Sequence, residues 1–322
     1  MCTAPHPVAL EAHSRFIEAN LGNPGLYPGT ADMEREVISW LGELMSRPEA
    51  SGQIVSGGTE ANITALWIAR NLWRKRRVVY GQTAHFSFGK AVNLLGLEPV
   101  VVGVAGTTEL GVVDPIVGLA EAVDGRAPLH VDAAFGGMVL PFLRRLGRGV
   151  PPFDFSVEGV FSLSTDPHKM GLSTIPSGAV LFREEQGVEL ITVEAPYLTV
   201  KDQRSLSGTR CSAAVAATWA VMAHLGREGY TAVVQRCMAM TERTAAGVRK
   251  AGAELVIDPP PMNIVAFHHD DPSGVLDAMR GRGWCLSRAT HPRAVRIVVM
   301  PHANERTVDA MVADLADVLA KK

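Results

Sequence analysis

The chain has 322 residues, of which 47% are hydrophobic and 20% are charged, and its formal net charge is −2. This length and balance predict a globular protein with one large and one small domain. A near-neutral charge without a block of like charges argues against nucleic acid or a membrane surface as a main partner. No apolar run reaches the length of a membrane span, and no secretory leader opens the sequence.

The sequence gives no sign of a metal site. The four cysteines, at positions 2, 211, 237 and 285, lack the spacing of metal ligands, so we expect reduced thiols in a cytoplasmic protein. His268-His269-Asp270-Asp271 resembles a ligand cluster on paper. Adjacent residues of a strand point to opposite faces, which favours a solvated strand end instead.

The N-terminal region combines one helix with a loop rich in proline and glycine. A helix is predicted over residues 8–20, and residues 23–30 must form a loop. That loop is either a rigid connection or part of a site. Asp32 can then cap a helix that runs to about Met45, because apolar residues recur at helical spacing.

The next stretch, residues 52–62, predicts a phosphate cradle. A short strand leads into glycines and then into a helix over 59–73. Glycines let the backbone approach an anion, and the helix start offers free N–H groups and a positive dipole end. Gly58 and Thr59 are the expected contacts, although an ordinary N-terminal helix cap would show the same residue pattern. The stretch lacks both the Walker ending and the dinucleotide fingerprint.

Strands alternate with helices from residue 53 to 183, which is typical of an α/β fold with a mostly parallel sheet. The expected strands after the cradle cover residues 78–80, 98–102, 128–132 and 160–163. Cofactors in such sheets bind beyond the carboxyl ends of the strands. His85, Asp132 and Lys169 each follow a predicted strand, so we expect them to lie together.

The C-terminal part predicts a second, smaller α/β unit. After a loop over residues 184–211, the expected elements are helices at 213–225 and 230–251, a strand at 263–268, a helix at 273–281, a strand at 294–300 and a helix at 304–320. The predicted division is an N-terminal loop and helix segment 1–31, a large domain 32–235 and a small domain 236–322.

Asp132 and Lys169 carry the chemistry. Most lysines are solvated, and a strand-end aspartate can simply cap a helix. Lys169, however, follows His168 in a turn after an apolar strand. A lysine amine can form a Schiff base with the aldehyde of pyridoxal phosphate, and an aspartate can keep the pyridine nitrogen protonated. The pair therefore suits this cofactor.

The motifs His-Val-Asp-Ala-Ala at 130–134 and Asp-Pro-His-Lys at 166–169 resemble those of the group II pyridoxal phosphate-dependent amino-acid decarboxylases. The archaeal-type L-tyrosine/L-aspartate decarboxylases are the most similar, over nearly the whole chain. The resemblance implies the type I fold of pyridoxal phosphate enzymes (aspartate aminotransferase-like) and a homodimer with shared active sites. It also implies conversion of L-tyrosine to tyramine or of L-aspartate to β-alanine, with release of carbon dioxide.

The resemblance also implies roles for individual residues. His85 would stack on the cofactor ring, and Tyr197 or His168 would return a proton to the substrate. The remaining residues expected at the cofactor are Gly58, Thr59, Thr108, Ala134, Ser162, Asp166, Ser207, Gly208 and Thr209, the last three reaching the phosphate from the neighbouring subunit. Substrate contacts are expected from Tyr27, Phe86 and Arg210. Arg210 is the candidate for the substrate carboxylate, because a planar guanidinium suits a carboxylate.

Three other functions fit the same motifs. A carbon–carbon lyase of the sphingosine-phosphate lyase type shares the lysine and the aspartate, but it needs additional cations for the substrate phosphate. Glutamate decarboxylation is the second. A protein that holds pyridoxal phosphate without turnover is the third, and it would form the Schiff base but convert no amino acid.

Overall fold

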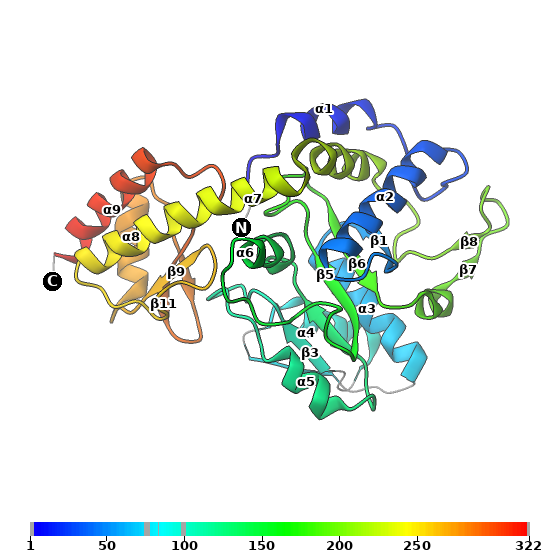
Figure 1. Ribbon diagram of the computed structural model, residues 1–322, viewed down its shortest axis with the longest axis horizontal. Helices are drawn as coiled ribbons and strands as arrows, with labels where there is room; N and C mark the ends of the chain where they lie inside the picture. The colour runs from blue at the N-terminus through cyan, green and yellow to red at the C-terminus, as the bar shows by residue number, and fades with distance from the viewer. Residues whose placement is uncertain (1–2, 74–77, 83, 98–100, 321–322) are drawn as a thin grey trace.

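The computed structural model describes residues 3–73, 78–82, 84–97 and 101–320. The chain forms a large body around a six-stranded sheet and a smaller body around a three-stranded sheet (Figure 1). The long helix α7, Ser212–Lys250, runs from the large body into the small one. None of the described helices is long and apolar enough to cross a membrane.

The large sheet has the strand order β1-β6-β5-β4-β3-β2. Strands β2 to β5 are parallel, and β6 is antiparallel to both of its neighbours, β1 and β5. The α/β fold with a mostly parallel sheet is therefore confirmed. The strands are β1 Ser51–Val55, β2 Val79–Tyr80, β3 Val101–Val104, β4 Leu129–Asp132, β5 Val160–Thr165 and β6 Gly178–Phe182.

The side chains of β4 alternate between the two faces of the sheet, and this alternation decides which of them reach the site. Leu129 and Val131 point into the main apolar core, which also holds residues of α2 and α6. His130 and Asp132 point to the opposite face and bond with Asn62 of α3. The helices of the large body are α1 Pro7–Arg15, α2 Pro28–Leu44, α3 Gly58–Trp73, α4 Ser87–Leu95, α5 Ile116–Val123 and α6 Leu140–Arg145, with short 3₁₀ helices at Gly136–Met138 and Glu185–Ile191.

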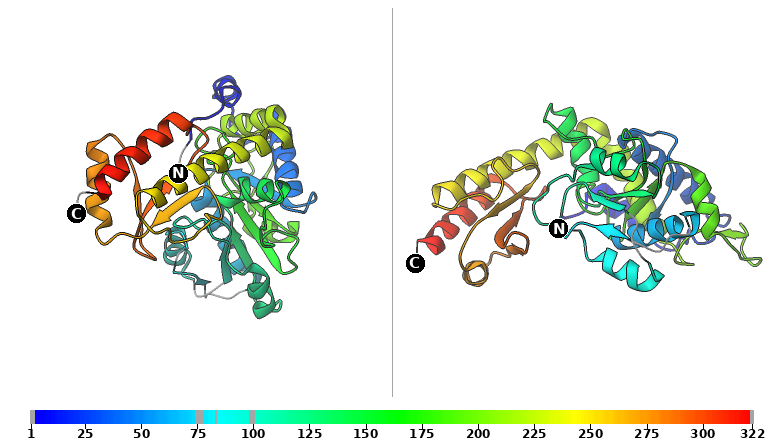
Figure 2. Two further views of the ribbon diagram at one scale, coloured as in Figure 1. Left: turned by 60° about the vertical axis from the view of Figure 1, so that its left-hand side comes forward. Right: turned by 90° about the horizontal axis from the view of Figure 1, so that it is seen from below.

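The small body packs its antiparallel sheet, in the order β10-β11-β9, against α7, α8 and α9 (Figure 2). Its elements are β9 Ile264–Phe267, α8 Pro272–Gly281, β10 Ser287–Ala289, β11 Ala294–Val298 and α9 Glu305–Leu319. The two helices predicted at 213–225 and 230–251 are one element, α7, broken at Gly226, where φ is 56° and ψ is −170°. The predicted domain boundary at 235/236 falls inside this helix and stays a prediction.

Three local expectations differ from the structure. Helix α1 ends at Arg15, not at Asn20, because Asn20 forms a β-bridge with Cys211 and the chain there is extended. Helix α2 begins at Pro28, so residues 28–30 of the predicted loop are helical and Tyr27, not Asp32, is the N-cap residue. The expected loop 184–211 contains a small hairpin of β7 Val193–Glu194 and β8 Asp202–Gln203. Of the strand predicted at 98–102, residues 98–100 lie outside the described part of the chain.

Candidate active site

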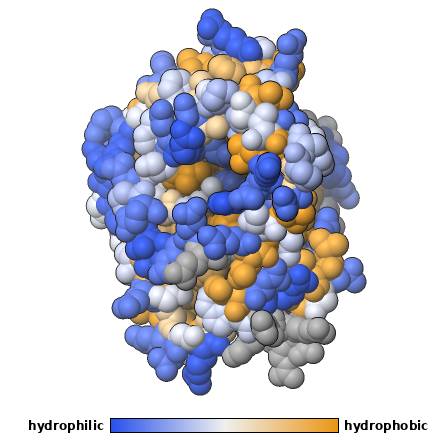
Figure 3. All heavy atoms as spheres, turned by 90° about the vertical axis from the view of Figure 1, so that its right-hand side faces the viewer, coloured by the Kyte–Doolittle hydropathy of each residue, from blue (hydrophilic) through white to orange (hydrophobic). Residues whose placement is uncertain are grey.

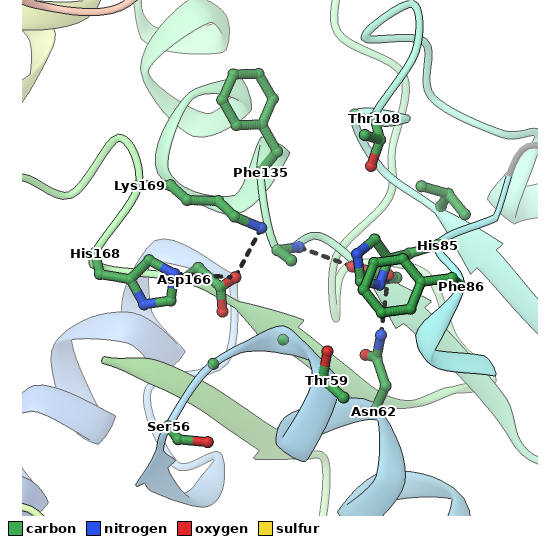
Figure 4. A pocket seen from close by; sticks show the side chains of 16 residues that line it. Ser56, Thr59, Asn62, His85, Phe86, Thr108, Phe135, Asp166, His168 and Lys169 are labelled. Atoms are coloured by element: carbon green, nitrogen blue, oxygen red, sulfur yellow. Dashed lines mark hydrogen bonds and ion pairs between the residues drawn. The ribbon is translucent and has the colours of Figure 1, made fainter. Parts of the chain in front are cut away.

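A cavity of about 380 Å³ opens at the carboxyl end of the central strands (Figure 4). Its walls come from the glycine turn before α3, the segment before α4, the end of β4 and the turn after β5. The predicted site residues that line it are Gly58, Thr59, His85, Phe86, Thr108, Asp132, Ala134, Asp166, His168 and Lys169. Most of the site residues predicted from the sequence therefore lie together beyond the strand ends.

Lys169 reaches the cavity from the turn after β5. Its Nζ lies 2.8 Å from Oδ2 of Asp166, and Nε2 of His168 lies 3.7 Å from the same oxygen (Figure 4). Burial raises the pKa of the Asp166 carboxyl group, while the Lys169 and His168 charges act to lower it. Burial also lowers the pKa of His168. The turn is tied down by Tyr230 of α7, whose hydroxyl donates to the carbonyl of Gly171 at 2.8 Å.

Asp132 ends β4 with its carboxylate held on both oxygens. Oδ1 accepts from the backbone N–H of Ala134 at 3.0 Å and from the Ser164 hydroxyl at 3.4 Å. Oδ2 accepts from the side-chain amide of Asn62 at 3.0 Å. The carboxylate is buried and faces the cavity, and the small side chain of Ala134 leaves the space beside it open.

His85 and Phe86 form the wall on the α4 side of the cavity. Their ring centroids are 4.0 Å apart, and Nδ1 of His85 lies 2.9 Å from the hydroxyl of Ser87. Burial lowers the pKa of His85, with a smaller raising effect from Asp132. A neutral, flat ring on this wall is suited to packing against another flat ring.

The glycine turn before α3 forms a close-fitting edge of the cavity. A Cβ placed on Gly58 would lie 3.0 Å from Cβ of Ala134 and 3.2 Å from Oδ2 of Asp166, so a side chain at this position would crowd the edge of the cavity. The first N–H groups of the 16-residue helix α3 begin at this turn. They form the type of site that binds phosphate. A phosphate cradle, a lysine amine and a buried carboxylate in one cavity fit the phosphate, aldehyde and ring nitrogen of pyridoxal phosphate.

The other predicted site residues lie elsewhere. Ser162 is fully buried behind Asp132 and bonds to His130. Tyr27 extends its hydroxyl toward the carbonyl of Glu18, and Tyr197 is 85% exposed on the loop between β7 and β8. Ser207, Gly208 and Thr209 lie in the segment that leads to α7, where Ser207 and Thr209 line a separate cavity of about 170 Å³.

Arg210 is also outside the cavity of Lys169. Its guanidinium forms an ion pair with Glu34 and donates to the carbonyl of Ile54 at 2.7 Å. The substrate contact predicted for Arg210 would require this pair to open. Among the described residues, no group of three or more His, Cys, Asp or Glu side chains could hold a metal ion.

Sequence reasoning missed Arg296 of β11. Its guanidinium donates to the carbonyl of Thr108, which lines the cavity, and Nε donates to the Ser287 hydroxyl at 3.0 Å. Burial lowers its pKa, while the charge of Glu109 acts to raise it. The signal in the sequence that could have identified it is an arginine in the middle of an otherwise apolar strand.

Comparisons with known proteins identify similar sequences and a similar fold. The model of the pyridoxal-dependent decarboxylase conserved domain matches residues 90–270. The chain is 47% identical to a probable L-tyrosine/L-aspartate decarboxylase of Methanothrix thermoacetophila, over 99% of this chain and 89% of the relative. It is 41% identical to an L-aspartate/L-glutamate decarboxylase of Pyrococcus horikoshii, over 99% and 91%. Among solved structures, a sphingosine-1-phosphate lyase of Burkholderia pseudomallei aligns with a TM-score of 0.90 at 26% identity, over 99% and 85%.

Proposed function

Because the chain belongs to the pyridoxal-dependent decarboxylase family, we propose that it removes the α-carboxyl group of L-tyrosine, L-aspartate or both as carbon dioxide. The products would be tyramine and β-alanine. The 47% identity to the Methanothrix thermoacetophila relative, over 99% of this chain, carries the proposal. The cavity around Lys169 and Asp132 supplies the side chains that such a reaction needs.

Pyridoxal phosphate is the cofactor of this family, and when bound it supplies a protonated ring that accepts the electrons of the breaking bond to the carboxylate. We assign Lys169 as the nucleophile that holds the cofactor aldehyde. Asp166, at 2.8 Å from Nζ, is placed to take the proton that the lysine must lose before it can attack. Asp132 would hold a proton on the ring nitrogen of the bound cofactor, and His85 would pack against its ring.

The substrate needs a cation for its carboxylate, and we assign this role to Arg296. It reaches the cavity edge through the carbonyl of Thr108, and partial burial strengthens its electrostatic attraction for an anion. A planar guanidinium also fixes the direction of a carboxylate, as the reaction requires. Phe86, exposed at the mouth of the cavity, could pack against the substrate side chain.

The proton returned to Cα is assigned to His168 or to Tyr197. His168 already lines the cavity, and its Nδ1 accepts from the backbone N–H of Ser177 at 3.1 Å, so Nε2 is the nitrogen left to carry a proton. Tyr197 lies on an exposed loop. Its participation requires either movement of that loop or a site shared between subunits.

We further propose a cytoplasmic homodimer in which Ser207, Gly208 and Thr209 reach the phosphate of the neighbouring subunit. Exposed apolar side chains lie in the loops around this segment: Leu26, Val193, Tyr197, Val200 and Leu206. The face that carries the β7–β8 hairpin is turned to the viewer in Figure 3, where hydrophobic residues lie among hydrophilic ones around a hollow. Cys211, Cys237 and Cys285 are free thiols, which supports a reducing compartment.

A carbon–carbon lyase is the second candidate, favoured by the TM-score of 0.90 to the Burkholderia pseudomallei lyase. That reaction needs a place for the phosphate of the substrate in addition to the phosphate of the cofactor. Arg296 is the only cation that we assign to the substrate side of the cavity. The relatives of 41–47% identity favour decarboxylation.

The test is carbon dioxide release from L-tyrosine, L-aspartate and L-glutamate with added pyridoxal phosphate. The wild type is compared with Lys169→Ala and with Lys250→Ala, which removes an exposed lysine at the end of α7. We expect release with the wild type and the Lys250 variant, and none with the Lys169 variant. A wild type that binds the cofactor but releases no carbon dioxide from any of the three would contradict the proposed reaction.

A further inference from the structure

Behind Asp132 lies a chain of buried polar side chains that the proposed reaction does not use. Nε2 of His130 lies 3.0 Å from Oδ1 of Asn62, and Nδ1 lies 2.9 Å from the hydroxyl of Ser162. The Asn62 amide nitrogen lies 3.0 Å from Oδ2 of Asp132 and 3.0 Å from the hydroxyl of Ser87. All five side chains are buried, so each polar atom depends on these partners.

This series of hydrogen-bonded side chains has one consistent arrangement of protons. The carboxylate of Asp132 accepts only, so the amide nitrogen of Asn62 must face it and Oδ1 must face His130. A flipped amide would place two acceptors 3.0 Å apart in a buried site. Oδ1 of Asn62 therefore accepts from Nε2–H of His130, and Nδ1 of the same ring accepts from the hydroxyl of Ser162.

The state of His130 agrees with this arrangement. Burial lowers the pKa of His130 to about 4, so the ring is neutral near pH 7 and carries a single proton. The hydrogen-bond partners place that proton on Nε2. The ring is also packed against Phe88, with 6.2 Å between the ring centroids. His130 is thus fixed in both position and tautomer, which makes it a rigid support for the amide of Asn62.

The two hydrogens of the Asn62 amide go to two different residues. One is bonded to Asp132, and the other to Ser87, whose hydroxyl lies 2.9 Å from Nδ1 of His85. Figure 4 shows Asn62 beneath His85, with a dashed line from its amide nitrogen. One side chain therefore orients both the carboxylate expected at the ring nitrogen and the imidazole expected on the ring face.

We propose that Asn62, held by His130, is a positioning residue that sets Asp132 and His85 together and so fixes the orientation of the cofactor ring. His130 acts through Asn62 and touches neither the cofactor nor the substrate. The inference rests on the proposed cofactor site, but not on the choice of amino acid. It predicts that a change at His130 alters how pyridoxal phosphate is bound, although the side chain is one layer away.

The experiment compares His130→Leu with His130→Gln, whose side-chain amide can still donate toward Asn62. Thr64→Val is the matched control, because Thr64 is also fully buried on α3 but its hydroxyl has no hydrogen-bond partner in the described chain. Three quantities are measured: the dissociation constant of pyridoxal phosphate, the visible circular dichroism of the bound cofactor relative to its absorbance, and kcat and KM.

Loss of one buried donor should weaken cofactor binding roughly tenfold in the Leu variant. Its relative circular dichroism should change, and kcat should fall with little change in KM, because the substrate contacts remain. The Gln variant and the Thr64 control should stay close to the wild type. Equal damage in the Leu and Gln variants, or a Leu variant with unchanged affinity and dichroism, would overturn the proposal.

If His130→Leu does not fold, Ser87→Ala provides a milder test, since it removes only the link from Asn62 to His85. It should weaken cofactor binding several-fold while the protein keeps its thermal transition. Unchanged affinity in this variant would refute the coupling of the two sides. A wild type that binds no pyridoxal phosphate would instead contradict the proposed function, so the two failures are distinguishable.

Discussion

The hydroxyl group of Tyr230 offers a test of how the turn that carries Lys169 is held in place. Its ring is 3% exposed and stacks on Phe142, with centroids 5.5 Å apart. Its hydroxyl donates to the carbonyl of Gly171, two residues after Lys169, at 2.8 Å. Tyr230→Phe keeps the ring and its packing and removes only the hydroxyl, so the variant isolates one hydrogen bond between α7 and the turn.

The expected loss follows from the bond that is broken. An intramolecular hydrogen bond contributes about 0.5–1.5 kcal/mol net, and a buried carbonyl left without a partner costs about 1–3 kcal/mol. No other backbone donor to Gly171 O occurs in the described chain. We therefore expect Tyr230→Phe to lower the free energy of unfolding by about 1–3 kcal/mol. Truncation to alanine would add the loss of ring packing and cost about 3–5 kcal/mol.

The assay is urea unfolding of the wild type, Tyr230→Phe and the control Tyr80→Phe, whose side chain is 39% exposed. Burial raises the pKa of Tyr230, whereas the unfolded chain ionises its tyrosines near pH 10. The difference between wild type and Tyr230→Phe should thus be constant from about pH 6 to 9 and shrink above about pH 10, where only the wild type gains an ionisable group on unfolding. A difference below about 0.5 kcal/mol at pH 7 would refute the reasoning, because it is less than one net hydrogen bond.

Three further predictions follow from the same geometry. Gly58→Ala should weaken pyridoxal phosphate binding roughly tenfold by narrowing the cradle, as measured by cofactor titration; Gly89→Ala, where a Cβ meets nothing within 4 Å, should not. Arg296→Gln should raise KM for the amino acid about 10- to 100-fold and leave cofactor affinity unchanged, whereas Arg288→Gln, which changes an exposed residue of the neighbouring strand β10, should change neither. An unchanged KM would remove Arg296 from the substrate site. Because burial lowers the pKa of His130 to about 4, its stabilising contribution is present above about pH 6.5 and lost as the pH falls toward 4. As the pH falls from about 6.5 to 4, the free energy of unfolding should therefore decrease less in His130→Gln than in the wild type, by up to about 1.4 kcal/mol per pH unit. The same pH dependence of the free energy of unfolding in both proteins would contradict this.

The sequence predicted the centre of the site because its signals are local. Asp132 and Lys169 each follow a short apolar strand and precede a turn, and parallel strands bring such positions to one edge of the sheet. The glycines before α3 also mark their position without any knowledge of distant residues. The fold class and the order of the elements could be predicted for the same reason.

The missed parts depend on contacts between distant segments. The sequence predicts a helix over residues 59–73, but it does not show that Asn62 meets β4. Arg210 and Arg296 are equally plausible carboxylate ligands in sequence, and only the folded chain pairs Arg210 with Glu34. The antiparallel position of β6 between β1 and β5 is likewise a non-local pairing that no local pattern encodes.

The break at Gly226 sets the direction in which the second half of α7 runs toward the small body. With φ at 56° and ψ at −170°, this residue has a backbone conformation that side chains other than glycine rarely adopt. The arm from Gly226 to Lys250 is about 36 Å long, so a 10° change at the break would displace its far end by about 6 Å. Tyr230 anchors the start of this arm to the large body, and the small sheet, with Arg296, is attached to its far part, so the angle at Gly226 sets where Arg296 lies. The position of the cation that we propose for the substrate therefore depends in part on one glycine that lies outside the cavity.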